Sequence, residues 1–272
     1  TDNKGVRQAR LERLIAQGGT SIIAVGNAYR EAVLAVARAH PKVRFALVDA
    51  VPVTAPNVLN VTFADEQGSY LVGVAAALKT KTNRVGFVGG VQSSVVEAFQ
   101  AGFTAGAKAV NPSIAVDTAY LGVFPDGSGF QSAAAARAAA GRMYSAGADI
   151  VFHAAGGSGS GVFDAAVAAH AWAIGVDSDQ YLTVAPEVQQ AILTSMVKRL
   201  DVAVYFVIKS IAEGAFTPGV ERFDLKSGGV DYATSGGRVD DIKATLEDYR
   251  EKIIAGQIVV PTVPSKPTTT TR

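Results

Sequence analysis

Two charged residues of this sequence stand after short apolar runs, where a side chain can reach a ligand. Asp177 follows the run Ala173–Val176, and a second acid, Asp179, comes two residues later. An ionised carboxylate accepts paired hydrogen bonds from vicinal hydroxyl groups, so Asp177 is a candidate for binding a polyhydroxylated molecule. The alternative is a solvated aspartate that forms a turn at the end of a strand. Lys198 follows the run Ile192–Met196 and could donate to ligand oxygens while balancing Asp177, or it could be only a surface charge at the start of a helix.

An aromatic residue and a glycine-rich segment follow two other apolar runs. Phe124 could cover the face of a planar ring, since stacking on a base contributes roughly 1–3 kcal/mol, or it could belong to the core. The segment 156–161 reads Gly-Gly-Ser-Gly-Ser-Gly and lacks the Gly-Lys-Ser/Thr ending of a phosphate-binding loop. We interpret Gly156 as a close backbone approach to a neutral ligand edge, with a plain flexible turn as the alternative.

Residue patterns of the common enzymes and metal sites are missing. The three histidines, His40, His153 and His170, have no metal-pair spacing, and structural roles are expected for them. No serine stands in a nucleophile elbow with plausible triad partners, and no calcium-type aspartate cluster is evident. The sequence therefore predicts neither an enzyme, nor a metal site, nor a cofactor.

Short apolar runs alternate with longer alanine-rich segments of helical periodicity, which is typical of β-α units around a parallel sheet. Predicted strands cover residues 21–25, 45–49, 58–63, 84–88, 116–121, 149–153, 173–176 and 192–196. Predicted helices cover residues 6–17, 31–39, 67–79, 94–110, 131–146, 161–170 and 198–213. Loops at the carboxyl ends of such strands converge on a crevice, and this geometry selects the candidate ligand-binding residues. They are Asn27, Tyr29, Phe124, Gly156, Asp177 and Lys198.

Composition limits the class of protein further. The chain has 272 residues, 49% of them hydrophobic, which is enough for one large or two smaller α/β units. The formal net charge of +1 gives no basic field for nucleic acid, so nucleic acid is not an expected partner. The chain has no cysteine, which excludes disulfides and is compatible with export, and no apolar stretch is long enough for a membrane helix.

The chain opens with a helical pattern over residues 6–17, whereas a doubly wound unit normally begins with a strand. We therefore expect the first β-α unit of the fold to be missing from this polypeptide. At the other end, residues 259–272 are rich in proline and threonine and are expected to be a disordered tail.

Several segments, taken in order, resemble the basic membrane protein family, which includes purine nucleoside receptor lipoproteins. Three of them are Phe-Ala-Asp-Glu-Gln-Gly-Ser-Tyr-Leu-Val-Gly at 63–73, Arg-Val-Gly-Phe-Val-Gly-Gly at 84–90 and Ala-Gly-Gly-Ser-Gly-Ser-Gly-Val at 155–162. A fourth is Ile-Gly-Val-Asp-Ser-Asp-Gln at 174–180. The Asp-rich, Asn-Phe-containing loop with which members of this family begin has no match here, so the stacking aromatic from that loop is unassigned.

The resemblance implies a type I periplasmic-binding fold, with two doubly wound parallel-sheet lobes joined by a hinge. The first lobe is predicted to comprise residues 1–64 and 189–218, and the second residues 65–188 and 219–258. This division places Asn27, Tyr29 and Lys198 in the first lobe, and Phe124, Gly156 and Asp177 in the second.

The resemblance also implies a function. The expected protein is the extracytoplasmic solute-binding component of an ABC transporter, which captures a nucleoside between two lobes, with a purine nucleoside as the first choice. Its partners would be that small molecule and the transporter permease subunits, with the membrane reached only through a lipid anchor that this chain lacks. The alternative is a ligand-sensing regulatory domain of a transcription regulator or signalling receptor, because the same fold serves such proteins.

Overall fold

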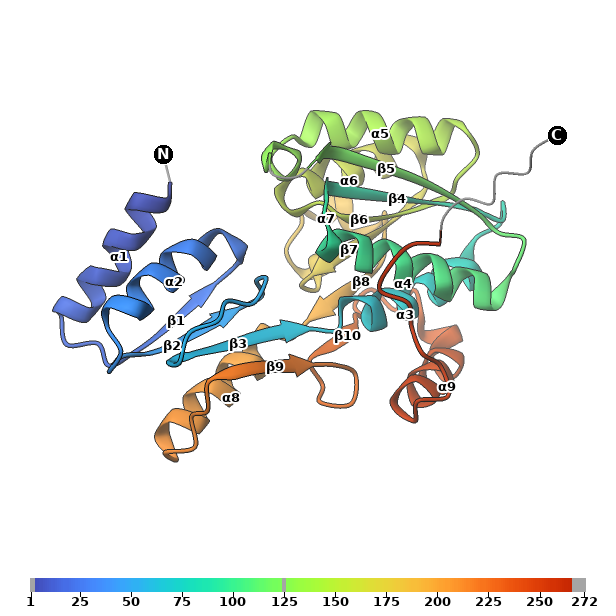
Figure 1. Ribbon diagram of the computed structural model, residues 1–272. Coiled ribbons are helices and arrows are strands. Elements are labelled where there is room, and N and C mark those ends of the chain that lie inside the picture. Colours follow the sequence, from blue (N-terminus) through green and yellow to red (C-terminus); the bar gives the residue numbers. More distant parts are fainter. Residues whose placement is uncertain (1–2, 124–125, 266–272) are drawn as a thin grey trace. The chain divides into compact units, whose positions relative to one another are not determined.

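The computed structural model describes residues 3–123 and 126–265, and its contacts divide the chain into two compact units. Unit 1 contains the chain up to Ala64 together with Arg199–Gly229. Unit 2 contains Asp65–Lys198 and the chain from Val230 onward. Each unit has its own sheet (Figure 1).

Unit 1 is built on a four-stranded parallel sheet in the order β1-β2-β3-β9. The strands are β1 (Ser21–Val25), β2 (Arg44–Val48), β3 (Val58–Phe63) and β9 (Gly219–Phe223). Helices α1 (Lys4–Ala16) and α2 (Arg30–Ala39) lie on one face of this sheet and α8 (Leu200–Ala212) on the other (Figure 1). The side chains of Val33, Val36, Phe45 and Leu47 are fully buried at the centre of this unit, because both faces of the sheet are covered.

Unit 2 contains a six-stranded sheet in the order β10-β8-β7-β6-β4-β5. The strands are β4 (Arg84–Gln92), β5 (Ala115–Val123), β6 (Ile150–Ala154), β7 (Trp172–Asp177), β8 (Ile192–Lys198) and β10 (Val230–Tyr232). Only β10 is antiparallel to its neighbour among the pairings of the described residues. Because β6, β7 and β8 are adjacent and parallel, their carboxyl ends lie at the same edge of the sheet.

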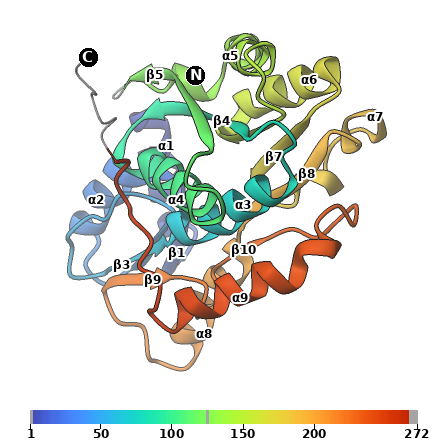
Figure 2. The same cartoon turned by 90° about the vertical axis from the view of Figure 1, so that its right-hand side faces the viewer.

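Helices cover both faces of the unit 2 sheet (Figures 1 and 2). Helices α5 (Ala133–Ser145) and α6 (Gly159–Ala169) pack together on one face, with the short α7 (Pro186–Gln189) beside α6. Helices α3 (Asp65–Lys79) and α4 (Ser94–Val110) pair on the other face, and α9 (Lys243–Ile254) packs against α3.

Three glycines allow the unusually close approach of α3 and α4. A Cβ atom added to Gly73 would lie 2.2 Å from the Phe103 carbonyl oxygen. The same atom on Gly102 would lie 2.1 Å from the Glu66 carbonyl oxygen, and on Gly106 it would lie 2.0 Å from that of Tyr70. All three distances are below van der Waals contact, so only glycine fits where the two helix backbones touch. This packing fixes the start of α3, which matters for the site.

The α/β class with parallel sheets in two units is as predicted, and β1 and β3 have the predicted ends. The first change of unit falls after Ala64, at the predicted position, but the other two boundaries lie about ten residues later than the predicted 188/189 and 218/219. The reason is the pairing of β8, which is hydrogen-bonded to β7 and β10 and so belongs to unit 2 as a whole. Lys198, the last residue of β8, is therefore in unit 2 and not in the unit of Asn27 and Tyr29, which corrects its assignment.

The carboxyl-terminal part of the chain contains elements that the apolar pattern did not predict. Strands β9 and β10 and helix α9 are absent from the predicted set. Of the predicted disordered tail, residues 259–265 are described, and they contain no helix or strand; Val260 among them is buried. No helix in the described part of the chain is long and apolar enough to cross a bilayer.

Candidate functional site

Asp177 stands at the carboxyl end of β7 in a strained backbone conformation. Its φ is +65°, in the left-handed region that non-glycine residues rarely occupy. The amide of Ser178 donates to the carbonyl oxygen of Val176 at 2.8 Å, so Asp177 is the central residue of a three-residue turn. Such a conformation costs on the order of 1–3 kcal/mol and is characteristic of functional sites. The turn leaves half of the Asp177 side chain exposed at the end of the sheet.

The ammonium group of Lys198 lies between two carboxylates. Its Nζ atom is 3.6 Å from Oδ1 of Asp177 and 3.2 Å from Oδ1 of Asp65. The Lys198 side chain is only 4% exposed, against 50% for Asp177, so the lysine is buried whereas the carboxylate is accessible to solvent. The structure thus brings together the two charged candidates of the sequence, Asp177 and Lys198, and adds Asp65 to them.

Burial makes this arrangement electrostatically demanding. The Asp65 side chain is 10% exposed, and the ring of buried Phe99 lies 5.2 Å from the Lys198 ammonium nitrogen. A charge withdrawn from water needs ionic and hydrogen-bonding partners, and an ammonium also gains from an aromatic face. The Asp177 carboxylate can accept hydrogen bonds from hydroxyl groups, and it disfavours an anionic group beside it.

Asp65 was not among the predicted site residues. Sequence spacing gives no sign of the contact, because Asp65 and Lys198 lie in distant parts of the chain. The one available signal was position: Asp65 starts α3 and is separated from the apolar strand β3 by Ala64 alone. An aspartate at this position is already explained by the preference for acidic residues at the start of a helix, so the sequence does not indicate an ion pair.

The glycine-rich segment after β6 is a 3₁₀ turn over Gly156–Ser158 that leads into α6. Gly156 is exposed and has a φ of +53°, as expected of a glycine turn at a strand end. Two later glycines serve packing instead, because a Cβ on Gly159 would lie 2.0 Å from the ring of His153 and one on Gly161 would lie 1.9 Å from the Ala133 carbonyl oxygen. Of these three glycines, Gly156 alone is both exposed and in the left-handed region, so it remains the candidate for ligand contact.

A buried serine holds this turn to the segment before α5. The Ser158 hydroxyl donates to the Gly129 carbonyl oxygen at 2.8 Å and accepts from the Ser132 amide at 2.7 Å. The same segment carries Phe130, whose half-buried ring lies against Gly90 of β4 and beside Gly156. Phe130 is thus a described aromatic ring at the carboxyl ends of β4 and β6, which the sequence reasoning missed. The predicted aromatic, Phe124, lies outside the described residues.

Asn27 and Tyr29 belong to unit 1, after β1, in a 3₁₀ turn over Asn27–Tyr29. The exposed Asn27 side chain accepts a hydrogen bond from the Val51 amide at 3.2 Å, which ties together the loops after β1 and β2. Tyr29 is half-buried against the core of its unit, and its hydroxyl lies 3.4 Å from Nη1 of Arg10. Asn27 is therefore presented at a strand end, whereas the Tyr29 ring is engaged within its own unit.

The three histidines have structural surroundings. His40 contacts Glu12 at 2.8 Å, and His170 ends α6 in the left-handed conformation with a φ of +50°. His153 is completely buried in β6 with its ring against Phe163, and burial lowers its pKa to about 4. Within the residues that the structure describes, no group of three or more potential ligand side chains could hold a metal ion.

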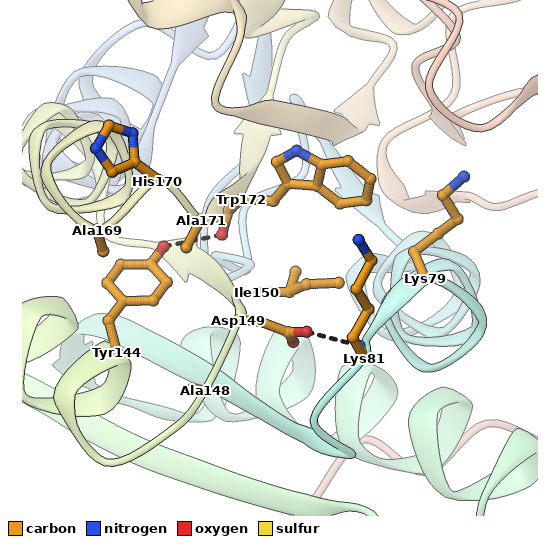
Figure 3. Close-up of a pocket in the computed structure, with 10 residues that line it drawn as sticks. All are labelled: Lys79, Lys81, Tyr144, Ala148, Asp149, Ile150, Ala169, His170, Ala171 and Trp172. Atoms are coloured by element: carbon orange, nitrogen blue, oxygen red, sulfur yellow. Dashed lines mark hydrogen bonds between the residues drawn. The ribbon is translucent and has the colours of Figure 1, made fainter.

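A cavity of about 320 Å³ lies at the opposite edge of the unit 2 sheet, at the amino ends of β6 and β7 (Figure 3). Its walls include the half-buried Trp172, with the Lys79 ammonium 5.7 Å from the indole centroid, and Tyr144, which donates to the Trp172 carbonyl oxygen. Asp149 faces this cavity but is engaged by the Thr80 hydroxyl and the Lys81 amide, both at 2.6 Å. The cavity is therefore separate from the cluster at Asp177.

The chain resembles known substrate-binding proteins over nearly its whole length. The profile of the family described as ABC transporter substrate-binding protein PnrA-like matches residues 4–263. A CD4+ T-cell-stimulating antigen of Listeria monocytogenes is 39% identical over 89% of this chain and 70% of its own. The ABC transporter nucleoside-binding protein BmpA of Lactococcus lactis is 37% identical, over 90% of this chain and 72% of its own. Basic membrane protein A of Borreliella burgdorferi is 32% identical, over 92% and 74%.

Solved structures share the fold. A transcriptional activator of the comK gene from Bacillus halodurans superimposes with a TM-score of 0.79 at 22% identity, covering 96% of this chain and 87% of that one. An ABC transporter solute-binding protein from Conexibacter woesei gives a TM-score of 0.76 at 24% identity, covering 96% and 85%. Family membership rests on the family profile and on the relatives. It confirms the resemblance found in the sequence, and the members of this family are substrate-binding proteins and not enzymes. The chain belongs to the PnrA-like family of ABC transporter substrate-binding proteins.

Proposed function

We propose that this protein captures a nucleoside, with purine nucleosides as the preferred class, for an ABC transporter. The observation that carries the proposal is the exposed Asp177 carboxylate, held in a strained turn beside the buried Lys198 ammonium. Two carboxylate oxygens can accept hydrogen bonds from the 2′- and 3′-hydroxyl groups of a ribose, and the ammonium can donate to a ribose oxygen.

The neighbouring strand ends supply what a nucleobase needs. Gly156 on β6 allows close approach of a ligand to the backbone, and Phe130 offers an aromatic ring over β4 and β6. Neighbouring strands are about 4.8 Å apart, so two strand spacings from β7 to β4 span about 10 Å, which suits a nucleoside with its ribose on Asp177. Phe124 and Asn27 stay candidates for further contacts, as does Tyr29 once its ring is released from its own unit.

The Lactococcus lactis relative named as a nucleoside-binding protein supports this choice of ligand class. Membership in a family of ABC transporter substrate-binding proteins implies transporter permease subunits as partners and a place outside the cytoplasmic membrane. A lipid anchor would tether the protein there. The regulatory alternative rests on fold alone, since the structure named as a transcriptional activator is only 22% identical.

Isothermal titration of the chain with guanosine, adenosine and uridine tests the proposal, with free guanine, adenine and ribose as comparisons. At least one nucleoside should bind more tightly than its free base and than ribose, because only the nucleoside engages both the ribose-binding acid and the ring-binding wall. Absence of heat with all three nucleosides, for a chain shown to be folded by circular dichroism, contradicts the proposal.

A further inference from the structure

Asp65 and Lys198 stand at two of the points where the chain passes between its units. The chain enters unit 2 at Asp65, leaves it after Lys198 and enters it again at Val230. Lys198 and Val230 are direct partners in the β8–β10 pairing, so two of these points are adjacent in the sheet. The remaining point is Asp65, and its ion pair with Lys198, at 3.2 Å, connects it to the other two. One buried ammonium thus belongs both to the candidate ligand site and to the segments that connect the units.

Two carboxylates compete for this ammonium. The Lys198 Nζ atom is closer to Asp65, at 3.2 Å, than to Asp177, at 3.6 Å. Asp65 is nearly buried and fixed at the start of α3, whereas Asp177 is half exposed. An ion pair is stronger where water is excluded, so the pull of Asp65 on Lys198 is the stronger one. Without it, the ammonium would move toward Asp177 and compete with ligand hydroxyl groups for that carboxylate.

We infer that Asp65 is a positioning residue of the ligand site: it holds the Lys198 ammonium back from Asp177, so that the ammonium competes less with ligand hydroxyl groups for the Asp177 carboxylate. This inference rests on the proposed function, because it assigns Asp177 to a ribose. Asp65 itself need not touch the ligand. Its effect is selective, since it concerns the hydroxyl groups that Asp177 binds and not the ring of the base.

The substitution Asp65→Asn gives a selective test, because asparagine keeps the shape of the side chain and removes the charge that retains Lys198. Guanosine and 2′-deoxyguanosine differ by one of the hydroxyl groups at issue, so the ratio of their affinities reports on that hydroxyl. We expect Asp65→Asn to weaken guanosine at least tenfold and 2′-deoxyguanosine less than threefold, which shrinks the ratio. Adenosine and uridine, each with its 2′-deoxy counterpart, are titrated in the same way.

Two further variants separate positioning from folding. Asp65→Glu restores the charge and should recover most of the guanosine affinity. Asp241→Asn removes the carboxylate of another lysine pair in unit 2, Lys79–Asp241 at 3.0 Å, and should leave both affinities unchanged. If Asp65→Asn does not fold, Asp65→Ser, which also removes the charge, is titrated in its place: a ratio below that of the parent chain supports the inference, and an unchanged ratio overturns it.

The outcomes also separate this inference from the function on which it rests. Equal losses for guanosine and 2′-deoxyguanosine in Asp65→Asn, or no loss for either, overturn the role of Asp65 while the nucleoside function stands. A loss in Asp241→Asn as large as that in Asp65→Asn overturns it as well. A parent chain that binds none of the three nucleosides removes the proposed function together with this role.

Discussion

The ammonium nitrogen of Lys198 lies 3.6 Å from Oδ1 of Asp177, which joins the carboxyl ends of the neighbouring strands β7 and β8. The donor, the Lys198 ammonium, is buried, and the acceptor, the Asp177 carboxylate, is half exposed. Only the acceptor therefore reaches the solvent at the edge of the sheet. Under the proposed function, a hydroxylated ligand would contact both groups.

Replacement of the acceptor should reduce affinity. Asp177→Asn removes the charge and one of the two acceptor oxygens, and a hydrogen bond to a charged group contributes about 1.5–3 kcal/mol. We therefore expect nucleoside affinity to fall by about 10- to 100-fold, measured by isothermal titration. Asp117→Asn is the matched control, because Asp117 forms an ion pair with Arg84 at 2.7 Å, away from the site. Unchanged affinity in Asp177→Asn would remove Asp177 from the site.

Two glycine-to-alanine substitutions should have opposite effects on stability. Gly106→Ala places a Cβ 2.0 Å from the Tyr70 carbonyl oxygen and must separate α3 from α4, so we expect a loss of about 1–3 kcal/mol. Gly141, inside α5, has no atom within 4 Å of its added Cβ, so Gly141→Ala should stabilise the helix by about 0.5–1 kcal/mol. Urea unfolding measures both. A destabilised Gly141→Ala or a neutral Gly106→Ala would contradict the packing described.

The buried His153 should make stability depend on pH in the acidic range. Burial lowers its pKa from 6.5 to about 4, while the Gln180 side chain acts in the opposite direction. As pH falls, the unfolded chain therefore binds the proton before the folded chain does. The stability that the neutral His153 contributes is lost between about pH 6.5 and pH 4, and the free energy of unfolding falls by roughly 3 kcal/mol in all.

The measurement is the free energy of unfolding at several pH values for the parent chain and for His153→Gln. The variant should lose less stability than the parent over the interval from neutral pH to pH 4, whatever its stability at neutral pH. Equal losses in the two proteins would show that His153 is protonated in the folded state or is exposed there.

Ligand binding should leave the fluorescence of Trp172 nearly unchanged. Trp172, the sole tryptophan, begins β7 and Asp177 ends it, and at about 3.3 Å per residue the two are about 16 Å apart. A saturating nucleoside should therefore not shift the emission maximum, whereas iodide, which reaches the cavity beside Trp172, should quench it. A clear shift with nucleoside would place the ligand in that cavity instead (Figure 3).

Much of the fold could be predicted because buried strands of parallel sheets are continuous apolar runs. Strand β6, whose five residues are all buried, is of this kind. Strand β9 escaped prediction because four of its five residues are exposed and only Phe223 is buried. Helix α9 escaped because only Leu246 and Ile253 are buried on an otherwise charged helix. Edge elements carry a weak hydrophobic signal, since only part of their surface is covered.

For the proposed site, the sequence points only to residues that carry the signal alone. Asp177 follows an apolar run, so strand-end geometry singles it out as a candidate. Asp65 could not be found because its role depends on a contact with Lys198, which only the folded sheet brings near. The unit of Lys198 was misassigned for a related reason, since the pairing of β8 with β10 joins distant segments.

A crystal structure of the chain with bound guanosine shows whether Asp177 binds the ribose, through the distances from the Asp177 carboxylate oxygens to the ribose 2′- and 3′-oxygens. Both distances should be about 2.5–3.0 Å, as for hydroxyl groups that donate to a carboxylate. A ribose that faces away from Asp177, or guanosine bound beside Trp172, would contradict this binding mode.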